Sequence, residues 1–239
     1  MTESLLLTTT RVMTFHGAQA LTAASGFFFE RGERLFFVTS RHVVADEESG
    51  HIPDRVEILL HTDADNLTQV MRQSILLYRK GQSVWRQGRD RGGPIDVAVI
   101  ELDRPGLRRA SAVFKSFTPA HLLPSMQDAE VGQSVLVVGF PLGFHDTLHH
   151  LPVVRQAVIA SSFGLRFQGH GHFLTDARTH RGTSGAPVVM RRAAGGDLPW
   201  SLLGVHSSRM DMGGRDLTQD ECLGLNCAWY ADILNTLTA

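Results

Sequence analysis

The chain has 239 residues, with 23 lysines and arginines against 24 aspartates and glutamates, and its formal net charge is −1. This length can bury a sizeable core and suits one large domain or two small ones. The balanced charge lacks the basic excess of a nucleic-acid-binding protein, so no nucleic-acid partner is expected. No apolar run is long enough to span a bilayer, and no membrane partner is expected.

The N-terminal ten residues contain an acidic residue and only three consecutive leucines. They lack the positive n-region and longer apolar core of a secretory signal, although a mature chain stripped of its signal would look similar. There are two cysteines, Cys222 and Cys227, which are too few for the disulfide framework of a secreted protein. The sequence therefore predicts a cytoplasmic protein. A disulfide across a turn is an alternative to two reduced, buried thiols.

Short apolar segments rich in valine and phenylalanine, broken by Gly, Pro, Asp or Ser, predict β-strands along most of the chain. Twelve such strands at this spacing favour an all-β fold of two antiparallel six-stranded β-barrels packed side by side. The expected strands are Arg11–Phe15, Gly26–Glu30, Leu35–Thr39, Arg55–His61, Ser74–Arg79, Asp96–Leu102, Ser134–Phe140, Val153–Ser161, His172–Thr175, Ala186–Arg191, Leu202–Ser207 and Leu223–Ala228.

The segment 111–130 contains two prolines and little periodicity, so it is the expected crossover between the barrels. This places an N-terminal barrel in residues 1–110 and a C-terminal barrel in residues 131–239. A short helical turn is expected over Val43–Glu47. Apolar spacing in Tyr230–Leu237 predicts a terminal helix that packs on the second barrel.

Three motifs together predict a catalytic triad. His42 follows the apolar strand Leu35–Thr39, Asp96 opens the strand Asp96–Leu102, and Ser184 lies between glycines in Gly-Thr-Ser-Gly. A serine hydroxyl is a poor nucleophile unless an imidazole accepts its proton, and a carboxylate on the far side of the ring fixes the tautomer. The chain order His, Asp, Ser is one of the known orders of this triad.

Each motif alone has a more ordinary explanation. Gly-x-Ser-Gly is common in turns, a histidine among valines is more often a core residue, and an aspartate at a strand start usually caps a turn. Their joint occurrence in the right order favours catalysis. Glycine at position 182 would let the backbone amides of Gly182 and Ser184 point to one place and hold a developing oxyanion.

These segments resemble the trypsin/chymotrypsin-like serine endopeptidases. The stretch 175–185, Thr-Asp-Ala-Arg-Thr-His-Arg-Gly-Thr-Ser-Gly, is especially similar to the bacterial HtrA-type and glutamyl-endopeptidase-like branches. Residues 138–143 and 154–161 also look like second-barrel strands of those branches, and the likeness extends over about residues 25–234. The resemblance implies a double β-barrel with the active site between the barrels. It also implies a polypeptide substrate and hydrolysis of peptide bonds without a cofactor.

Two departures from that family pattern carry predictions. Thr183 stands where many secreted relatives have an aspartate that pairs with a new N-terminus after zymogen cleavage. Activation of the trypsinogen type is therefore not expected. Ala186 replaces a second glycine and tightens the loop around the nucleophile.

The resemblance also implies which residues wall the pocket for the side chain before the scissile bond. They are Arg178, Thr179, His206, Ser207 and Arg209. An imidazole and a hydroxyl can hydrogen-bond a substrate carboxylate, so a preference for acidic residues, glutamate above all, is one prediction. A preference for small or aliphatic residues is the alternative. A basic preference is disfavoured, because Arg178 stands at the pocket base.

The twelve histidines raise the question of a metal. His145, His149 and His150 cluster, as do His170 and His172, but no spacing matches a zinc motif, and neither a metal nor a cofactor is expected. Two alternatives to an endopeptidase remain, a catalytically weak peptide-binding pseudoprotease and an esterase-type hydrolase using the same triad. The sequence makes no prediction of oligomeric state.

Overall fold

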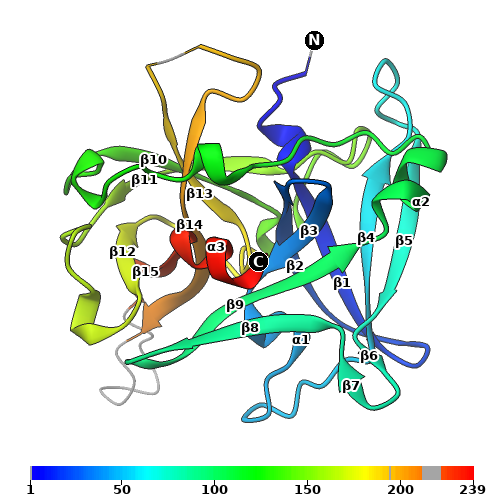
Figure 1. Cartoon of the computed structure of the whole chain (residues 1–239), viewed down its shortest axis with the longest axis horizontal. Helices are drawn as coiled ribbons and strands as arrows, with labels where there is room; N and C mark the ends of the chain where they lie inside the picture. The colour runs from blue at the N-terminus through cyan, green and yellow to red at the C-terminus, as the bar shows by residue number, and fades with distance from the viewer. Residues whose placement is uncertain (1, 194, 212–221) are drawn as a thin grey trace.

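The computed structural model describes residues 2–193, 195–211 and 222–239. Figure 1 shows two β-sheets lying side by side. The first half of the chain forms a seven-stranded antiparallel sheet in the order β5-β4-β1-β2-β3-β9-β8. The second half forms a closed antiparallel barrel in the order β10-β11-β12-β15-β14-β13. The predicted all-β, chymotrypsin-like fold with a six-stranded C-terminal barrel is confirmed, whereas the predicted N-terminal six-stranded barrel is a seven-stranded sheet.

The strands are mostly short, and the helices span at most six residues. The first sheet contains β1 (Thr9–His16), β2 (Gln19–Arg31), β3 (Arg34–Thr39), β4 (Arg55–His61), β5 (Val70–Leu76), β8 (Trp85–Asp90) and β9 (Gly93–Leu102). The barrel contains β10 (Ser134–Gly139), β11 (Val153–Ile159), β12 (His172–Asp176), β13 (Pro187–Arg191), β14 (Trp200–Asp211) and β15 (Cys222–Tyr230). A separate hairpin joins β6 (Tyr78–Arg79) to β7 (Gln82–Ser83).

The α-helices are α1 (Arg41–Val44), α2 (Arg104–Arg109) and α3 (Leu234–Leu237). Short 3-10 helices are η1 (Leu6–Thr8), η2 (Pro119–His121), η3 (Met126–Asp128), η4 (Pro141–Gly143), η5 (Phe167–Gly169) and η6 (Ala231–Ile233). Within the described part of the chain, no helix has the length and apolar character needed to cross a membrane.

The first sheet has seven strands where six were predicted, and the additional edge strand is β8. Each of the twelve predicted strands overlaps an observed one. In β8 only Trp85 is buried, and the other residues are half-buried or exposed. Such a polar segment carries no apolar alternation, so its pairing with β9 could not be predicted from pattern.

The run Phe27-Phe28-Phe29 in β2 buries both faces of the strand. Phe28 packs inside the first sheet with Phe37. Phe27 and Phe29 point the other way, into a core that also contains Trp229 of the barrel. Successive side chains of a strand point to opposite faces, so a continuous apolar run is what a strand between two cores requires. The two sheets therefore share a core, and this fixes the cleft between them.

The C-terminal helix packs against the first sheet as well as the barrel, which corrects the expectation for Tyr230–Leu237. The segment forms η6 and then α3, and Leu234 and Leu237 are buried in the shared core. Arg86 of β8 donates to the carbonyl oxygens of Leu237 (3.2 Å) and Ala239 (2.9 Å). Figure 1 shows α3 near the junction of the two sheets.

The segment 111–130 runs from the first sheet to the barrel. It follows α2, a helix that was not predicted, whose N-cap Asp103 accepts a hydrogen bond from the backbone of Gly106 (3.1 Å). Single β-bridges attach the segment to both sheets: Val113 to His61, Phe117 to Phe29, and Leu122 to Leu202.

Candidate active site

His42 is held in the first turn of α1, immediately after β3. The strand ends at Thr39 and the helix begins at Arg41, so the helical turn starts earlier than the predicted range Val43–Glu47. The backbone N–H of Ala45 donates to the carbonyl of Arg41 (2.9 Å) and closes this turn. The histidine therefore follows a fully paired strand and sits on a rigid turn.

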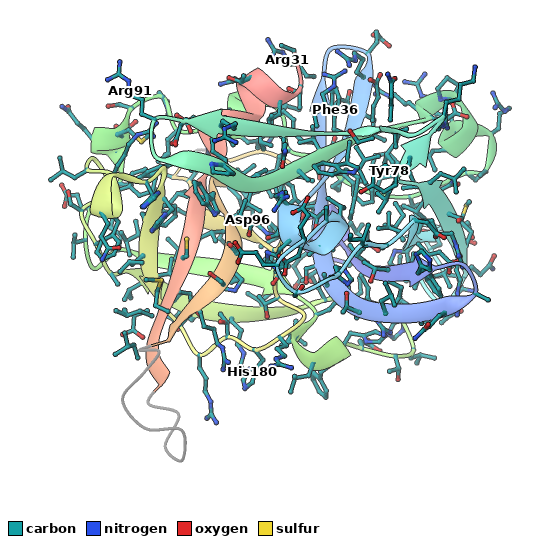
Figure 2. All side chains as sticks on the ribbon, turned by 90° about the horizontal axis from the view of Figure 1, so that it is seen from below. Arg31, Phe36, Tyr78, Arg91, Asp96 and His180 are labelled. Atoms are coloured by element: carbon teal, nitrogen blue, oxygen red, sulfur yellow. The ribbon has the colours of Figure 1, made fainter. Side chains whose placement is uncertain are left out.

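Asp96 lies in β9, just beyond the end of its neighbour β3. The last paired residues are Thr39 and Ala98, so Asp96 is two residues farther along and faces α1. Its Oδ1 accepts the backbone N–H of His42 (2.8 Å), and its Oδ2 lies 2.7 Å from His42 Nδ1. These two contacts fix both the ring and the carboxylate. Figure 2 shows Asp96 near the middle of the molecule in that view.

Ser207 of β14 connects Asp96 to the third residue of the predicted triad. Its hydroxyl donates to Asp96 Oδ2 (2.5 Å), and its carbonyl oxygen accepts the hydroxyl of Ser184 (3.0 Å). The sequence assigns Ser207 to substrate binding, but its side chain contacts Asp96. This hydroxyl supplies a further donor to the carboxylate and helps to orient it.

Ser184 and His42 line the same cleft, which has a volume of about 460 Å³. The fold thus brings together three residues that are far apart in sequence. In this rotamer the Ser184 hydroxyl donates to Ser207, and no hydrogen bond joins Ser184 to His42 among the described residues. Rotation about one side-chain bond redirects the hydroxyl, and such contacts often tighten only when substrate binds.

The loop before Ser184 leaves two backbone N–H groups available. Leu142 N–H donates to the carbonyl of Arg181 (2.6 Å), and the Ser25 hydroxyl donates to the carbonyl of Gly182 (2.8 Å). In a trans peptide the N–H points opposite to the C=O, so the Gly182 N–H points away from Leu142. The amides of Gly182 and Ser184 have no hydrogen-bond partner within the described ranges. They are suited to hold an oxyanion.

Ser25 of β2 positions this loop, and sequence analysis missed it. The residue is completely buried. Besides its bond to Gly182, its hydroxyl accepts the N–H of Phe140 (3.0 Å), and its own N–H donates to the carbonyl of Ser184 (2.9 Å). A serine inside a strand carries no signal of this role, because the partners lie more than 100 residues away.

Position 182 requires glycine because of its backbone conformation and because an added side chain would have no room, and a substitution can test this requirement. Its φ is +91°, and an added Cβ would lie 2.6 Å from the carbonyl oxygen of Phe140. Gly182→Ala is therefore expected to displace the loop and lower kcat by about 10²- to 10³-fold, the usual cost of losing an oxyanion donor. Peptide hydrolysis measured at saturating substrate checks this.

Gly132→Ala is the matched control for that substitution. Gly132 has a similar φ of +84°, but an added Cβ meets nothing within 4 Å. The Gly132→Ala variant should introduce similar backbone strain but leave kcat unchanged. An equal loss of kcat in both variants would contradict the role given to Gly182.

The charges around His42 favour its protonated form. Burial of the ring opposes protonation, but the hydrogen bond and negative charge of Asp96, together with the charge of Asp46, raise the pKa of His42 above its ordinary value. A base with a raised pKa accepts a proton more readily. The arrangement is suited to remove the proton of a nearby hydroxyl.

The predicted pocket residues divide into buried and accessible ones. Thr179 and His206 are buried, Arg178 is exposed, and Arg209 is half-buried on β14. Burial, together with the charge of His42, lowers the pKa of His206 to about 4. Its ring is therefore neutral near pH 7, and Nδ1 has no partner among the described residues. The positive charge that an imidazolium would offer an acidic substrate is absent there.

His145 and His149, which cluster in the sequence, form ordinary hydrogen bonds rather than surrounding a common point. His149 Nδ1 lies 2.7 Å from the carboxylate of Asp146, and His145 contacts the carbonyl of Gly143. Over the ranges that the structure describes, no group of three or more His, Cys, Asp or Glu is arranged to hold a metal ion. Cys227 is a free thiol whose pKa burial raises to about 12. The side chain of Cys222 lies outside the described residues.

Comparisons with known proteins identify the family and the fold of this chain. A family model described as a trypsin-like peptidase domain matches residues 24–195. A search of curated proteins found no match. Among solved structures, an HtrA-type protease with a tripeptide has a TM-score of 0.56 and 15% identity, covering 98% of this chain and 59% of that one.

Two further solved structures are similar. The serine endoprotease from Yersinia pestis has a TM-score of 0.55 and 14% identity, covering 98% of this chain and 62% of that one. Rv3671c from M. tuberculosis H37Rv, in an inactive mutant form, has a TM-score of 0.53 and 16% identity, and the match covers 98% of this chain and 86% of that one. The chain thus spans about three fifths of the first two proteins. At these identities the likeness establishes the fold, and the matched domain establishes the family. The chain belongs to the trypsin-like peptidase domain family, the family of serine endopeptidases that its sequence motifs predicted.

Proposed function

We propose that this protein hydrolyses peptide bonds with His42, Asp96 and Ser184 as its catalytic triad. The observation that carries the proposal is the 2.7 Å contact between His42 Nδ1 and Asp96 Oδ2, at a cleft that Ser184 also lines. With Nδ1 bound to the carboxylate, the Nε2 of His42 is the nitrogen left to act as a base.

In this mechanism Ser184 Oγ forms a bond to the substrate carbonyl carbon while its proton passes to His42 Nε2. The amides of Gly182 and Ser184 hold the resulting oxyanion. Collapse of the tetrahedral intermediate breaks the C–N bond, and His42 gives the proton to the leaving amine. A water molecule then attacks the acyl-enzyme by the same route, which releases the acid and restores the serine.

For the residue before the scissile bond, the buried pocket groups favour a small or aliphatic side chain. Neutral His206 offers no charge to an acidic one, and Thr179 is buried and hydrogen-bonded to Asn226. The guanidinium of Arg209, half-buried on β14, is the feature that favours the acidic alternative. The substrate in either case is a polypeptide.

A fluorophosphonate probe tests the proposal, because it reacts only with an activated serine. The wild type should be labelled at Ser184, and Ser184→Ala should not be labelled. If the protein is a pseudoprotease, it should bind peptides but be neither labelled by the probe nor able to cleave them. An esterase predicts labelling with hydrolysis of small esters but no cleavage of peptides. Either pattern would overturn the endopeptidase function.

A further inference from the structure

A second cavity, of about 580 Å³, lies along the crossover segment 111–130 and is lined by no member of the candidate triad. One of its walls is formed by residues 112 and 114–116 of this segment, and others are formed by α2 and by the turn between β13 and β14. In Figure 1 the crossover segment runs through the upper part of the view, whereas α1, which carries His42, lies in the lower part. A cavity of this volume is in the range of binding sites.

Over residues 113–117 the crossover segment has one hydrogen-bonded edge and one open edge. The backbone N–H groups of Val113, Lys115 and Phe117 donate to carbonyl oxygens in the N-terminal half of the chain, at 2.7 to 2.9 Å. Because successive N–H groups of an extended strand point to opposite edges, those of Phe114 and Ser116 point the other way. Neither has an acceptor among the described residues, and both residues line the cavity. The cavity therefore contains an open strand edge.

The spacing of these two N–H groups suits an extended peptide. Two residues of a strand advance by about 7 Å, and an added strand presents its own carbonyl oxygens at the same repeat. Peptides bind open sheet edges in this way, and their backbone supplies the hydrogen bonds that the edge lacks. The carbonyl oxygens of Phe114 and Ser116 share the open edge and would accept N–H groups of the peptide in return.

The charges around the cavity favour an acidic peptide. Four lysine and arginine side chains line it, against two carboxylates. Both carboxylates are already bound, Glu30 to Arg104 at 2.7 Å and Asp197 to Lys115 at 2.5 Å. Two positive charges are left over, and they belong to arginines at opposite ends of the cavity-lining stretch.

These two arginines are Arg108 and Arg192, and neither forms an ion pair within the described part of the chain. Arg108 is exposed on α2, just before the crossover segment. Arg192 follows β13 and donates to the carbonyl of Ala120 (2.7 Å) and to the hydroxyl of Ser201 (2.9 Å). Both acceptors are neutral, so they fix the guanidinium without compensating its charge, and they use two of its five N–H donors. Burial and the charge of Arg192 lower the pKa of the adjacent His121.

We propose that this cavity binds an extended acidic segment of another protein, which adds a strand to the open edge of residues 113–117 and places carboxylates at Arg108 and Arg192. The backbone of the bound segment supplies affinity along the edge, and its two acidic side chains select the partner. The site is separate from the active-site cleft, so the proposal does not depend on the proposed peptidase function.

The test is calorimetric titration of the full chain, carrying Ser184→Ala to prevent cleavage, with a capped seven-residue peptide. The peptide has glutamate at each end and alternating valine and threonine between them. It should bind at one site. Replacing both glutamates by glutamine should weaken binding by about 5- to 20-fold, the value of two partly exposed ion pairs, and replacing them by lysine should abolish it.

N-methylated peptides test the strand pairing. Methylation of the two N–H groups on one edge of the peptide should weaken binding by about 10- to 100-fold, the value of two hydrogen bonds. Methylation of the two on the opposite edge is the matched control and should have little effect. Equal effects of the two methylation patterns would contradict pairing through a single edge.

Variants of the protein place the bound peptide in this cavity. Arg108→Ala should weaken binding by about 3- to 5-fold, whereas Arg109→Ala, which removes an exposed arginine of α2 that does not line the cavity, should not. Ser116→Pro removes an N–H of the open edge, where proline is tolerated, and should weaken binding by about 10-fold. Ser116→Ala, which removes the same hydroxyl, is its control, and thermal unfolding checks that each variant folds.

The results distinguish this proposal from the peptidase function. If the wild type is labelled at Ser184 by the fluorophosphonate probe but the acidic peptide does not bind, or binds equally to Arg108→Ala and wild type, the proposal is wrong and the function stands. If the wild type is neither labelled nor active while binding depends on Arg108 and on the glutamates as described, the function fails and the proposal stands. Equal binding of the lysine and glutamate peptides would also overturn the proposal.

Discussion

Replacing Ser184 by alanine is expected to lower kcat for peptide hydrolysis by about 10⁶-fold, because the nucleophile and its base act as a unit. Replacing His42 by alanine should cost about the same. The double variant should be no slower than either single variant, since each removes the whole covalent route. Kinetics on the best peptide substrate with enzyme at high concentration would measure these rates.

The control for Ser184 is Ser162→Ala, a serine exposed on the loop after β11. Its kcat should match the wild type. Independent, multiplying losses in the Ser184 and His42 variants would contradict the role of His42 as the base for Ser184. The residual rate in the double variant reports what the oxyanion amides and substrate binding supply without a nucleophile.

The fold was largely predictable because its strands carry strong apolar patterns. Arg55–His61 forms β4 with both ends as predicted, since its apolar residues alternate with half-buried ones. β8 was missed because polar residues dominate it and its pairing with β9 supplies the order instead. The terminal helix was found, but its docking against Arg86 was not, because backbone carbonyl contacts leave no trace in sequence.

The candidate triad was predictable for a different reason. His42, Asp96 and Ser184 each lie beside a strong strand or a glycine loop, and the family resemblance supplies their order. Ser25 was not predictable. It acts through hydrogen bonds to backbone atoms of distant residues. Such partners are set by sheet register, and residue type alone does not reveal them.

The second large effect is expected from Asp96→Asn. In triads of this kind the amide lowers kcat by about 10⁴-fold, because its N–H competes for Nδ1 and favours the wrong tautomer of the imidazole. Asp96 Oδ1 would still accept the backbone N–H of His42, so the turn of α1 should remain in place. The loss is therefore expected in kcat, and thermal unfolding on the alkaline side of the His42 pKa should stay close to that of the wild type.

The same variant should also shift the pH dependence of the residual activity. His42 must be neutral to accept a proton, and its pKa is raised by Asp96 in the wild type. Wild-type kcat/KM should therefore fall as the pH drops through a value above the ordinary histidine pKa. Without the carboxylate charge, the burial that opposes protonation dominates, and the acid limb of Asp96→Asn should lie at lower pH.

The stability of the folded protein should depend on pH in the opposite sense to its activity. A group whose pKa is raised by folding stabilises the native state fully below its unfolded pKa, and this contribution is lost as the pH rises through the folded pKa. The His42–Asp96 pair therefore adds stability on the acid side, where the enzyme is least active. Asp96→Asn should remove that difference, which thermal unfolding followed from pH 5 to 9 would measure.

Asp46→Asn separates the charge of a carboxylate from its contact with the ring. Asp46 raises the pKa of His42 through its charge, whereas its carboxylate accepts a hydrogen bond from the Ser49 hydroxyl. This variant should move the acid limb slightly to lower pH while kcat at high pH stays near the wild-type value. If it instead lost as much kcat as Asp96→Asn, the assignment of Asp96 as the residue that orients His42 would be wrong. The shift shared by both variants is electrostatic, whereas the 10⁴-fold loss belongs to the carboxylate that contacts Nδ1.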